Sequence, residues 1–209
     1  MIAAYVRPIV CALVVGAITA CSSNQGYGSG ASSAGTVDLA AYPVPALGAS
    51  EAQLLRGMSD ADILGHFITV DSMEVATADS ALRVLKTQDV LEFARLMKAT
   101  HSENLIRDKQ LAEQTGITPI KMFGGLRASH VAAALDSIRQ ASDLKLDHHY
   151  VMAQIELHQH VLSELQELRG VAKNPAVVQQ IDAVIPMVRD HLARAHAIAV
   201  AHDFEKKHA

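Results

Sequence analysis

Aromatic residues and cysteine are scarce in this chain. Its 209 residues contain no tryptophan, four tyrosines, four phenylalanines and two cysteines, although half of the residues are apolar. Alanine supplies much of that apolar half, so the core must be built from small and aliphatic side chains. Such side chains favour closely packed helices over a sandwich of strands. No segment alternates apolar and polar residues for long enough to indicate a strand, and the sequence therefore predicts an all-α domain.

Three kinds of functional motif are also missing. The formal net charge is −4 and there is no long basic run, which argues against nucleic acid as a partner. There is no glycine-rich phosphate loop of the kind that binds nucleotides, and no Gly-x-Ser-x-Gly elbow of a serine hydrolase. These absences direct attention to side chains buried between helices.

The first twenty residues have the layout of a signal peptide. The segment reads MIAAYVRPIVCALVVGAITA, with one positive charge at Arg7 and an apolar run over residues 9–20. That run is too short to span a bilayer and matches the apolar region of a secretory signal. We expect residues 1–20 to be removed on export.

The end of this segment resembles the lipobox of bacterial lipoproteins. Thr19 and Ala20 precede Cys21 in the sequence ITAC. The resemblance implies cleavage before Cys21, lipidation of Cys21, and a membrane as partner through that lipid anchor. Ser22 is not acidic, which by the same analogy favours the outer membrane, with the protein facing the periplasm. The alternative is an ordinary signal peptide followed by an unmodified cysteine.

Cysteine usage after cleavage excludes two further features. Cys11 leaves with the signal, so that only Cys21 remains in the mature chain. An internal disulfide is then impossible, and so is a catalytic thiol if Cys21 is acylated. Stability must come from packing.

Residues 21–58 are expected to form a flexible tether. They are rich in Ser, Gly and Ala and contain Pro43 and Pro45. Such a composition buries too little apolar surface to offset the entropy lost on ordering. A tether of this composition has ends about 35 Å apart. It would hold a folded domain, residues 59–205, away from the lipid surface.

Helix signals follow one another through the folded domain. Ser59 with Asp62 predicts a capping box, Gly116 predicts a helix end, and Asn174 with Pro175 predicts a helix start. The expected helices are 59–85, 88–115, 128–140, 147–169 closed by Gly170, and 175–204 with a kink at Pro186. The short helix lies in a long crossover between the second and third long helices. This order predicts a ferritin-like four-helix bundle.

On each predicted long helix, one side chain that can bind a metal ion lies among the apolar residues of the buried face. We call this row of residues the apolar stripe. Glu74, for example, is seven residues from both Phe67 and Ala81, which places it on the buried face of its helix. The equivalent positions in the other helices are histidines. The four candidate metal ligands are Glu74, His101, His158 and His191. Helix lengths place the first three within about 3 Å of one level and His191 about 5 to 8 Å higher.

One carboxylate and three imidazoles suit a divalent transition metal ion such as zinc, copper or iron. The alternative is a buried polar network that fixes helix register, in which Glu74 pairs with a protonated histidine. The protein would then be a structural or protein-interaction lipoprotein of the envelope. Three further histidines, His148, His149 and His160, are expected on the surface.

A di-iron oxidase is disfavoured by the local sequence. That chemistry uses Glu-x-x-His on two helices, and the residues three positions before the stripe histidines are Lys98, Ile155 and Val188. The one match to the pattern, Glu205 with His208, lies at the C-terminus. The sequence therefore favours metal binding without turnover. It names no protein partner and is compatible with a monomer or an oligomer.

The stripe residues belong to longer motifs that resemble a known family, the bacterial envelope proteins of domain of unknown function 4142. The resemblance covers residues 60–202 and implies a ferritin-like fold and an envelope location, but no activity. Two positions depart from the family pattern: Thr100 stands where Asp is usual, and Leu146 where Phe is usual. The first departure removes the expected carboxylate neighbour of His101. The matching positions are Glu74, Ala81, Phe93, Ala94, Met97, His101, Asp147, Tyr150, His158, Leu162, Pro186, His191, Leu192 and Ala195.

Overall fold

The computed structural model describes residue 40, residues 42–120 and residues 145–204. Within these ranges the regular structure is five α-helices and no strand, so the predicted all-α class is confirmed. The short helix expected at 128–140, Cys21 and residues 1–39 lie outside the described residues. The helices are α1 (Ala49–Arg56), α2 (Asp60–Ala81), α3 (Gln88–Thr115), α5 (Leu146–Val171) and α6 (Pro175–Ala201).

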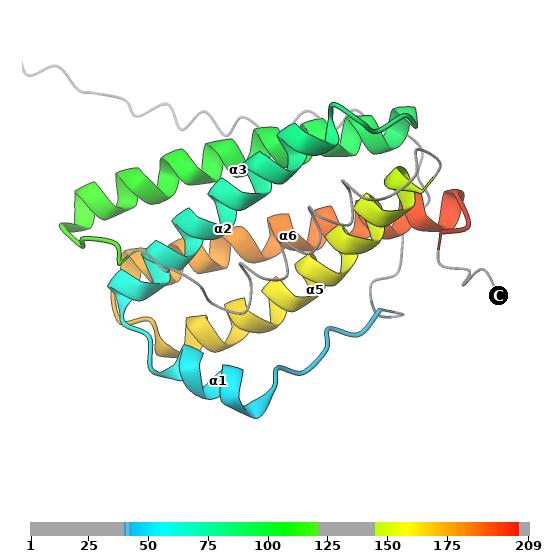
Figure 1. The fold of residues 1–209 in the computed structure, drawn as a ribbon. Coiled ribbons are helices and arrows are strands. Elements are labelled where there is room, and N and C mark those ends of the chain that lie inside the picture. The colour runs from blue at the N-terminus through cyan, green and yellow to red at the C-terminus, as the bar shows by residue number, and fades with distance from the viewer. Residues whose placement is uncertain (1–39, 41, 121–144, 205–209) are drawn as a thin grey trace, which may run out of the picture. The chain divides into compact units, whose positions relative to one another are not determined.

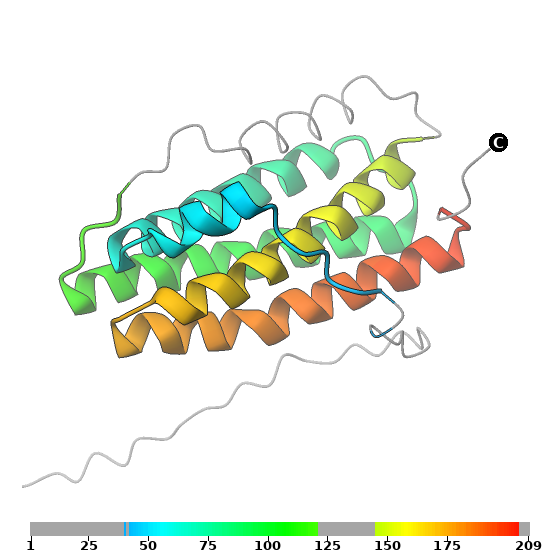
Figure 2. The same cartoon turned by 90° about the horizontal axis from the view of Figure 1, so that it is seen from below.

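The four long helices form two hairpins. Helix α2 packs on α3 and α5 packs on α6, while α3 also contacts α6 and the short α1 lies on α5 (Figure 1). Helices α3 and α5 run in the same direction, as the colour sequence in Figures 1 and 2 shows. The inner stripes of all four helices face a common core.

Helix boundaries follow the capping signals closely. Ser59 and Asp62 form the predicted capping box, with Ser59 N donating to Asp62 Oδ2 over 2.8 Å. Gly116 takes the left-handed conformation with φ 68° and ends α3. Asn174 accepts a hydrogen bond from the Ala176 amide over 2.9 Å and begins α6. The prediction at Gly170 is wrong, because α5 continues past this residue to Val171.

The predicted tether extends too far into the domain. The structure has an ordered segment over residues 42–58 that runs along α5 and includes α1 (Figure 2). Leu55 of α1 is buried, and Ser163 Oγ of α5 donates to the Pro45 carbonyl over 2.6 Å. Helix α1 buries only two apolar residues, Ala52 and Leu55. Such a short apolar pattern does not distinguish a packed helix from the polar sequence around it. The folded domain therefore begins before residue 59.

A buried carboxylate ties the α2–α3 connection to the start of α5. Asp147 accepts hydrogen bonds from the backbone amides of Lys86 at 3.0 Å and Thr87 at 2.8 Å, and from the Thr87 hydroxyl. Hydrogen bonds to a carboxylate are stronger than bonds between neutral groups. This contact explains why an Asp is useful at one of the positions shared with the family motif.

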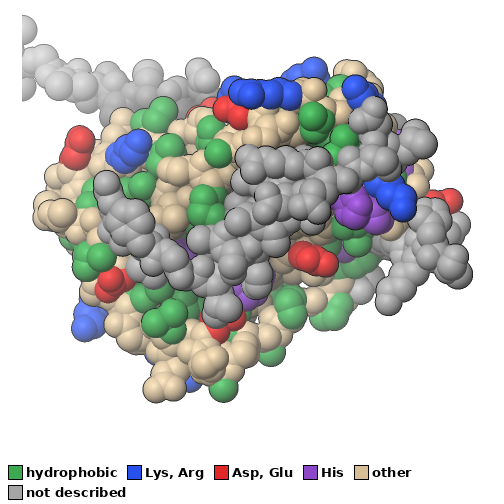
Figure 3. All heavy atoms as spheres, in the orientation of Figure 1, with side chains coloured by type: hydrophobic (Ala, Val, Ile, Leu, Met, Phe, Trp, Pro, Cys, Tyr) green, Lys and Arg blue, Asp and Glu red, His purple; other side chains and the backbone are tan. Residues whose placement is uncertain are grey.

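On the face seen in Figure 3, charged side chains of both signs are spread among apolar ones. The described part of this face has neither a large patch of one charge nor a large apolar patch. Large apolar side chains are exposed singly, on different elements: Val44, Leu54, Ile106, Ile120 and Val200. Single exposed apolar residues are normal for a folded domain. Among the described residues, no helix is both long enough and apolar enough to cross a membrane.

Replacing Gly65 by alanine should destabilise the domain. A Cβ at Gly65 would lie 1.7 Å from the Ile120 carbonyl oxygen, where the Ile120 amide also donates to the Ala61 carbonyl over 3.0 Å. Relief of that overlap requires a backbone shift, so we expect a loss of about 1–3 kcal/mol in the free energy of unfolding by urea. Gly170→Ala is the control, because a Cβ there meets nothing within 4 Å. It should stabilise the helix by about 0.5–1 kcal/mol, and equal effects of the two changes would contradict the packing argument.

Candidate metal centre

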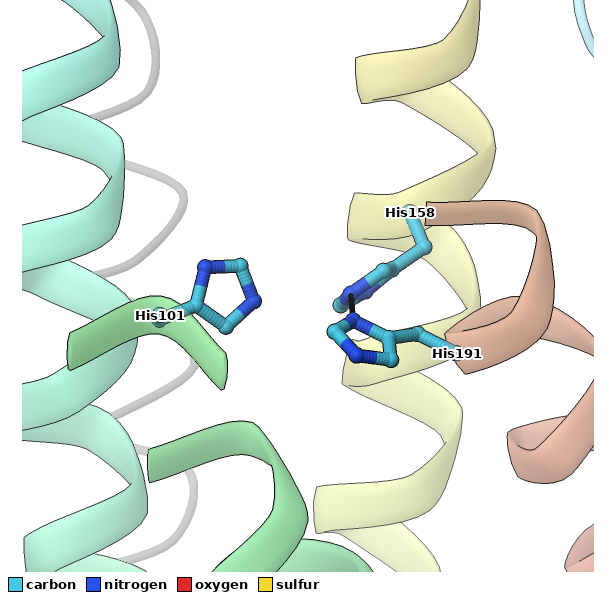
Figure 4. Close-up of side chains that lie close together, drawn as sticks. All are labelled: His101, His158 and His191. Atoms are coloured by element: carbon cyan, nitrogen blue, oxygen red, sulfur yellow. Dashed lines mark hydrogen bonds between the residues drawn. The ribbon is translucent and has the colours of Figure 1, made fainter. Parts of the chain in front are cut away.

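Three histidines from three helices converge in the core. His101 of α3, His158 of α5 and His191 of α6 each offer a ring nitrogen, and these nitrogens all lie within 4.8 Å of one another. Their side chains point toward one another in Figure 4. Each residue is at most 4% exposed. We call this group the central site.

The predicted offset of His191 along the bundle does not keep its ring away from the other two. His158 lies 13 residues before the end of α5 and His191 lies 16 residues after the start of α6, a difference of about 4.5 Å along the axis. The Cα–Cβ bonds of a helix tilt toward its N-terminus. Because α5 and α6 are antiparallel, the two side chains tilt toward each other, and their ring centroids are 5.3 Å apart.

Two contacts fix the protonated nitrogens of His158 and His191. His158 Nδ1 is 2.9 Å from the Gln154 carbonyl, which can only accept, so Nδ1 carries the hydrogen. His191 Nε2 is 3.2 Å from Thr100 Oγ1, and that hydroxyl already donates to the Leu96 carbonyl over 2.8 Å. The hydroxyl must therefore accept from His191, so Nε2 of His191 carries the hydrogen.

The remaining nitrogens of these two rings face each other as lone pairs. His158 Nε2 and His191 Nδ1 are 3.3 Å apart, the contact drawn in Figure 4. Two lone pairs at this distance repel unless a proton or a cation lies between them. A proton is disfavoured, because burial lowers the pKa of His158 to about 3 and also lowers the pKa of His191. Two imidazole nitrogens on one tetrahedral zinc ion are about 3.3 Å apart, given Zn–N bonds of about 2.0–2.1 Å.

His101 is oriented by a carboxylate that the sequence did not reveal. Its Nδ1 is 2.7 Å from Asp71 Oδ1 on α2. Its buried Nε2 has no hydrogen-bond partner among the residues that the structure describes. A carboxylate on one ring nitrogen of a histidine is the usual partner when the other nitrogen binds a metal. The family pattern has an Asp where this chain has Thr100. In this chain Asp71, from a different helix, supplies the carboxylate partner of His101.

Asp71 is itself paired with a second buried carboxyl group. Asp108 interacts with Asp71 and accepts a hydrogen bond from Gln180 Nε2 of α6 over 2.7 Å. Burial raises the pKa of Asp71 to about 7 and, together with the charge of Asp71, raises the pKa of Asp108 to about 8. Asp108 therefore stays protonated to a higher pH than Asp71. The pair connects α2, α3 and α6 next to the central site.

Glu74 is buried near the central site but is not part of its compact group of nitrogens. Its carboxylate accepts a hydrogen bond from Gln154 Nε2 over 3.0 Å, and it is 2% exposed. It lines a cavity of about 30 Å³ together with His101 and His158. Burial raises the pKa of Glu74, while the charge of His101 and the hydrogen bond from Gln154 lower it. Of the four predicted ligands, three histidines come together and Glu74 lies beside the same cavity.

The arrangement can hold a cation through three neutral imidazoles, with a carboxylate beside the cavity. The low pKa values of His158 and His191 keep their rings in the neutral form that binds metals. Sequence reasoning found the three histidines through their seven-residue spacing but missed Asp71 and Asp108. A signal was present, since Asp71 precedes Glu74 by three positions and Asp108 follows His101 by seven, each on the same helix face.

Comparison with known proteins gives a family without a described activity. The family described as "Domain of unknown function (DUF4142)" matches residues 44–198, which begins fifteen residues before the predicted domain boundary and includes α1. No curated protein and no solved structure matches the chain. The match covers most of the sequence and agrees with the family resemblance of the helix motifs. The chain belongs to the DUF4142 family.

Proposed function

We propose that this protein binds a divalent transition metal ion at the central site, as a lipid-anchored protein of the bacterial envelope. The observation that carries the proposal is the pair of facing lone pairs on His158 and His191, 3.3 Å apart in a buried core. Two lone pairs that face each other destabilise the folded state unless a cation binds both nitrogens. The third nitrogen, Nε2 of His101, is also buried without a hydrogen-bond partner among the described residues.

The donor set selects the class of ion. Three imidazoles suit zinc, copper or iron better than magnesium or calcium, which prefer oxygen ligands. The cavity of about 30 Å³ beside the histidines has room for a small fourth ligand such as water. Glu74 on its wall would compensate the charge of a bound cation, which in turn would remove much of the cost of burying this carboxylate. Nothing in this arrangement requires turnover, and binding is the function that the geometry supports.

The envelope location rests on the sequence. The segment that ends in Thr19, Ala20 and Cys21 supports export, lipidation of Cys21 and anchoring in the outer membrane. The anchored chain would face the periplasm, where the bundle can take up metal ions without a cytoplasmic carrier. Residues 22–41 would then be the link between the lipid and the bundle, a shorter link than the sequence predicts.

A second candidate function is a structural or interaction module of the envelope. The observation that favours it is the buried polar group of Asp71, Asp108 and Gln180, whose side chains interact across three helices without any ion. Such a network fixes helix register. It would make the histidines part of a specific core and leave function to the surface.

Metal content distinguishes these two candidates. The full chain is purified without a polyhistidine tag, exposed to zinc, copper or iron, and its metal content is measured by elemental analysis. His101→Ala and His158→Ala should each hold one ion per chain fewer than the unaltered chain, because two imidazoles remain from a set of three. His149→Ala is the matched control, since His149 lies on α5 outside the central site. Equal metal content in both site variants and the unaltered chain, or no binding by the unaltered chain, would favour the structural module.

A further inference from the structure

A second group of potential ligands lies between α1 and α5. Glu51 of α1 and His160 and Glu164 of α5 offer atoms that all lie within 4.8 Å of one another. We call this group the outer cluster. His160 was expected on the surface, but α1 partly covers it. The cluster shares no residue with the three histidines of the central site, although Glu164 lines the same cavity as His101 and His158.

The outer cluster is organised around one ring nitrogen. His160 Nε2 is 2.7 Å from Glu51 Oε1 and 3.5 Å from Glu164 Oε1. His160 and Glu164 are four residues apart and so share one face of α5. The second oxygen of Glu164 is 3.8 Å from His66 Nε2 on α2. Three elements therefore supply groups to this small region.

Burial separates this cluster from an ordinary surface ion pair. Glu164 is only 3% exposed, and a buried carboxylate requires compensation of its charge. His202 with Asp89 offers a comparison within the same chain, because His202 Nε2 is also 2.7 Å from a carboxylate oxygen. That pair is more exposed and has no third ligand in a compact group within the described residues. The outer cluster, in contrast, brings two carboxylates to His160 Nε2, and the second oxygen of Glu164 also faces His66.

We propose that Glu51, His160 and Glu164 form a second divalent-cation site, which fastens α1 to the bundle. One imidazole and two carboxylates are a donor set for zinc and similar first-row ions, with remaining positions filled by water. The ion compensates the charge of both carboxylates. Since Ala52 and Leu55 are the buried residues of α1, a metal bridge from Glu51 adds substantially to its attachment.

Zinc binding to site variants tests this proposal. The probe is Zn²⁺ alone, titrated by calorimetry into the full chain that carries His101→Ala and His158→Ala, so that the central site does not contribute. We expect one bound ion, and we expect zinc binding to be at least tenfold weaker when Glu51→Gln or His160→Gln is added. Changing a residue that only supports a metal ligand already weakens metal binding by about 10–100-fold, and these residues bind the ion directly. His202→Ala is the control and should leave zinc affinity unchanged.

The same question can be asked in the chain with an intact central site. There, Glu51→Gln should reduce the zinc content by one ion per chain, which also covers the case in which the double histidine variant fails to fold. Hydrogen exchange supplies a second readout: zinc should slow amide exchange within α1 in the unaltered chain and not in Glu51→Gln. Equal zinc binding with and without Glu51→Gln, or exchange in α1 that zinc does not change, overturns the proposal. Failure of the central site alone would leave one ion that still depends on His160.

Discussion

Zinc should raise the melting temperature of the chain, and replacement of His158 by leucine should abolish this increase while stabilising the metal-free protein. At one hundred times its dissociation constant a ligand adds about 2.7 kcal/mol to the stability of the native state. For a domain of this size that corresponds to about 5–11 °C. Both chains should carry Glu51→Gln, so that the outer cluster does not add to the effect.

The expected gain in the metal-free protein follows from the facing lone pairs. In chelator, His158 Nε2 and His191 Nδ1 lie 3.3 Å apart with no proton or ion between them. Leucine at position 158 removes one of these buried acceptors, and an unsatisfied buried polar group costs about 1–3 kcal/mol. The Gln154 carbonyl, which loses the contact from the His158 ring, keeps its place in the helix ladder. We therefore expect His158→Leu to be more stable in chelator by about 1–3 kcal/mol.

Calorimetric scans in chelator and in zinc measure both effects. The order of stability should reverse between the two conditions, with the histidine chain more stable in zinc and the leucine chain more stable in chelator. His149→Leu, outside the central site, should keep the zinc-induced increase. A leucine variant that is less stable in both conditions would show that the imidazole contributes to packing and not to ion binding.

The elements of the fold that could be predicted are those set by local chemistry. Ser59 with Asp62, Gly116, and Asn174 with Pro175 act on the backbone within one turn, and each defines a helix end in the structure. The seven-residue stripes place His101, His158 and His191 on buried faces for the same reason. Helix α1 did not give such a signal, because its attachment depends on contacts with α5 that are distant in sequence.

The central site could be predicted only in part. Periodicity shows which face of a helix a residue occupies, but not how deep a side chain reaches across the bundle. Glu74 is buried as predicted, yet its carboxylate is held by Gln154 of another helix and stays beside the three histidines. Asp71 lies on the same face of α2 and reaches His101 over 2.7 Å. The choice between these two carboxylates is made by packing between helices, which a single sequence does not specify.

Stability in the absence of metal should fall as pH rises from 6.5 to 8. Burial raises the pKa of Asp71 to about 7 and that of Asp108 to about 8, whereas unfolded carboxyl groups have a pKa of about 3.9. In this range the folded state holds protons that the unfolded state has released. Stability decreases with pH when the native state binds more protons, so this contribution is complete below about pH 4 and is lost as pH rises through the folded pKa values.

The histidines act in the opposite direction at lower pH. Burial lowers the pKa values of His101, His158 and His191 below the value of an unfolded histidine, about 6.5. Their contribution is present above pH 6.5 and is lost as pH falls toward their folded pKa values, since the unfolded state then takes up the protons. Between pH 6.5 and about pH 7.5 the unfolded histidines still release protons, so the histidines oppose part of the loss caused by the carboxyl groups. The contribution of Asp71 and Asp108 is therefore measured as the difference between the unaltered chain and a variant that lacks both carboxyl groups.

Urea unfolding in chelator should show that the unaltered chain loses about 2 kcal/mol more between pH 6.5 and pH 8 than the Asp71→Asn/Asp108→Asn variant. The reason is that carboxamides keep the hydrogen-bonding shape but do not titrate. Asp182→Asn is the control: Arg169 lowers the pKa of that exposed carboxyl, so it is ionised throughout the range and its removal should leave the pH dependence unchanged. The same pH dependence in the unaltered chain and the double variant would mean that any proton released on unfolding comes from another buried group, and that Asp71 meets His101 as a permanent carboxylate.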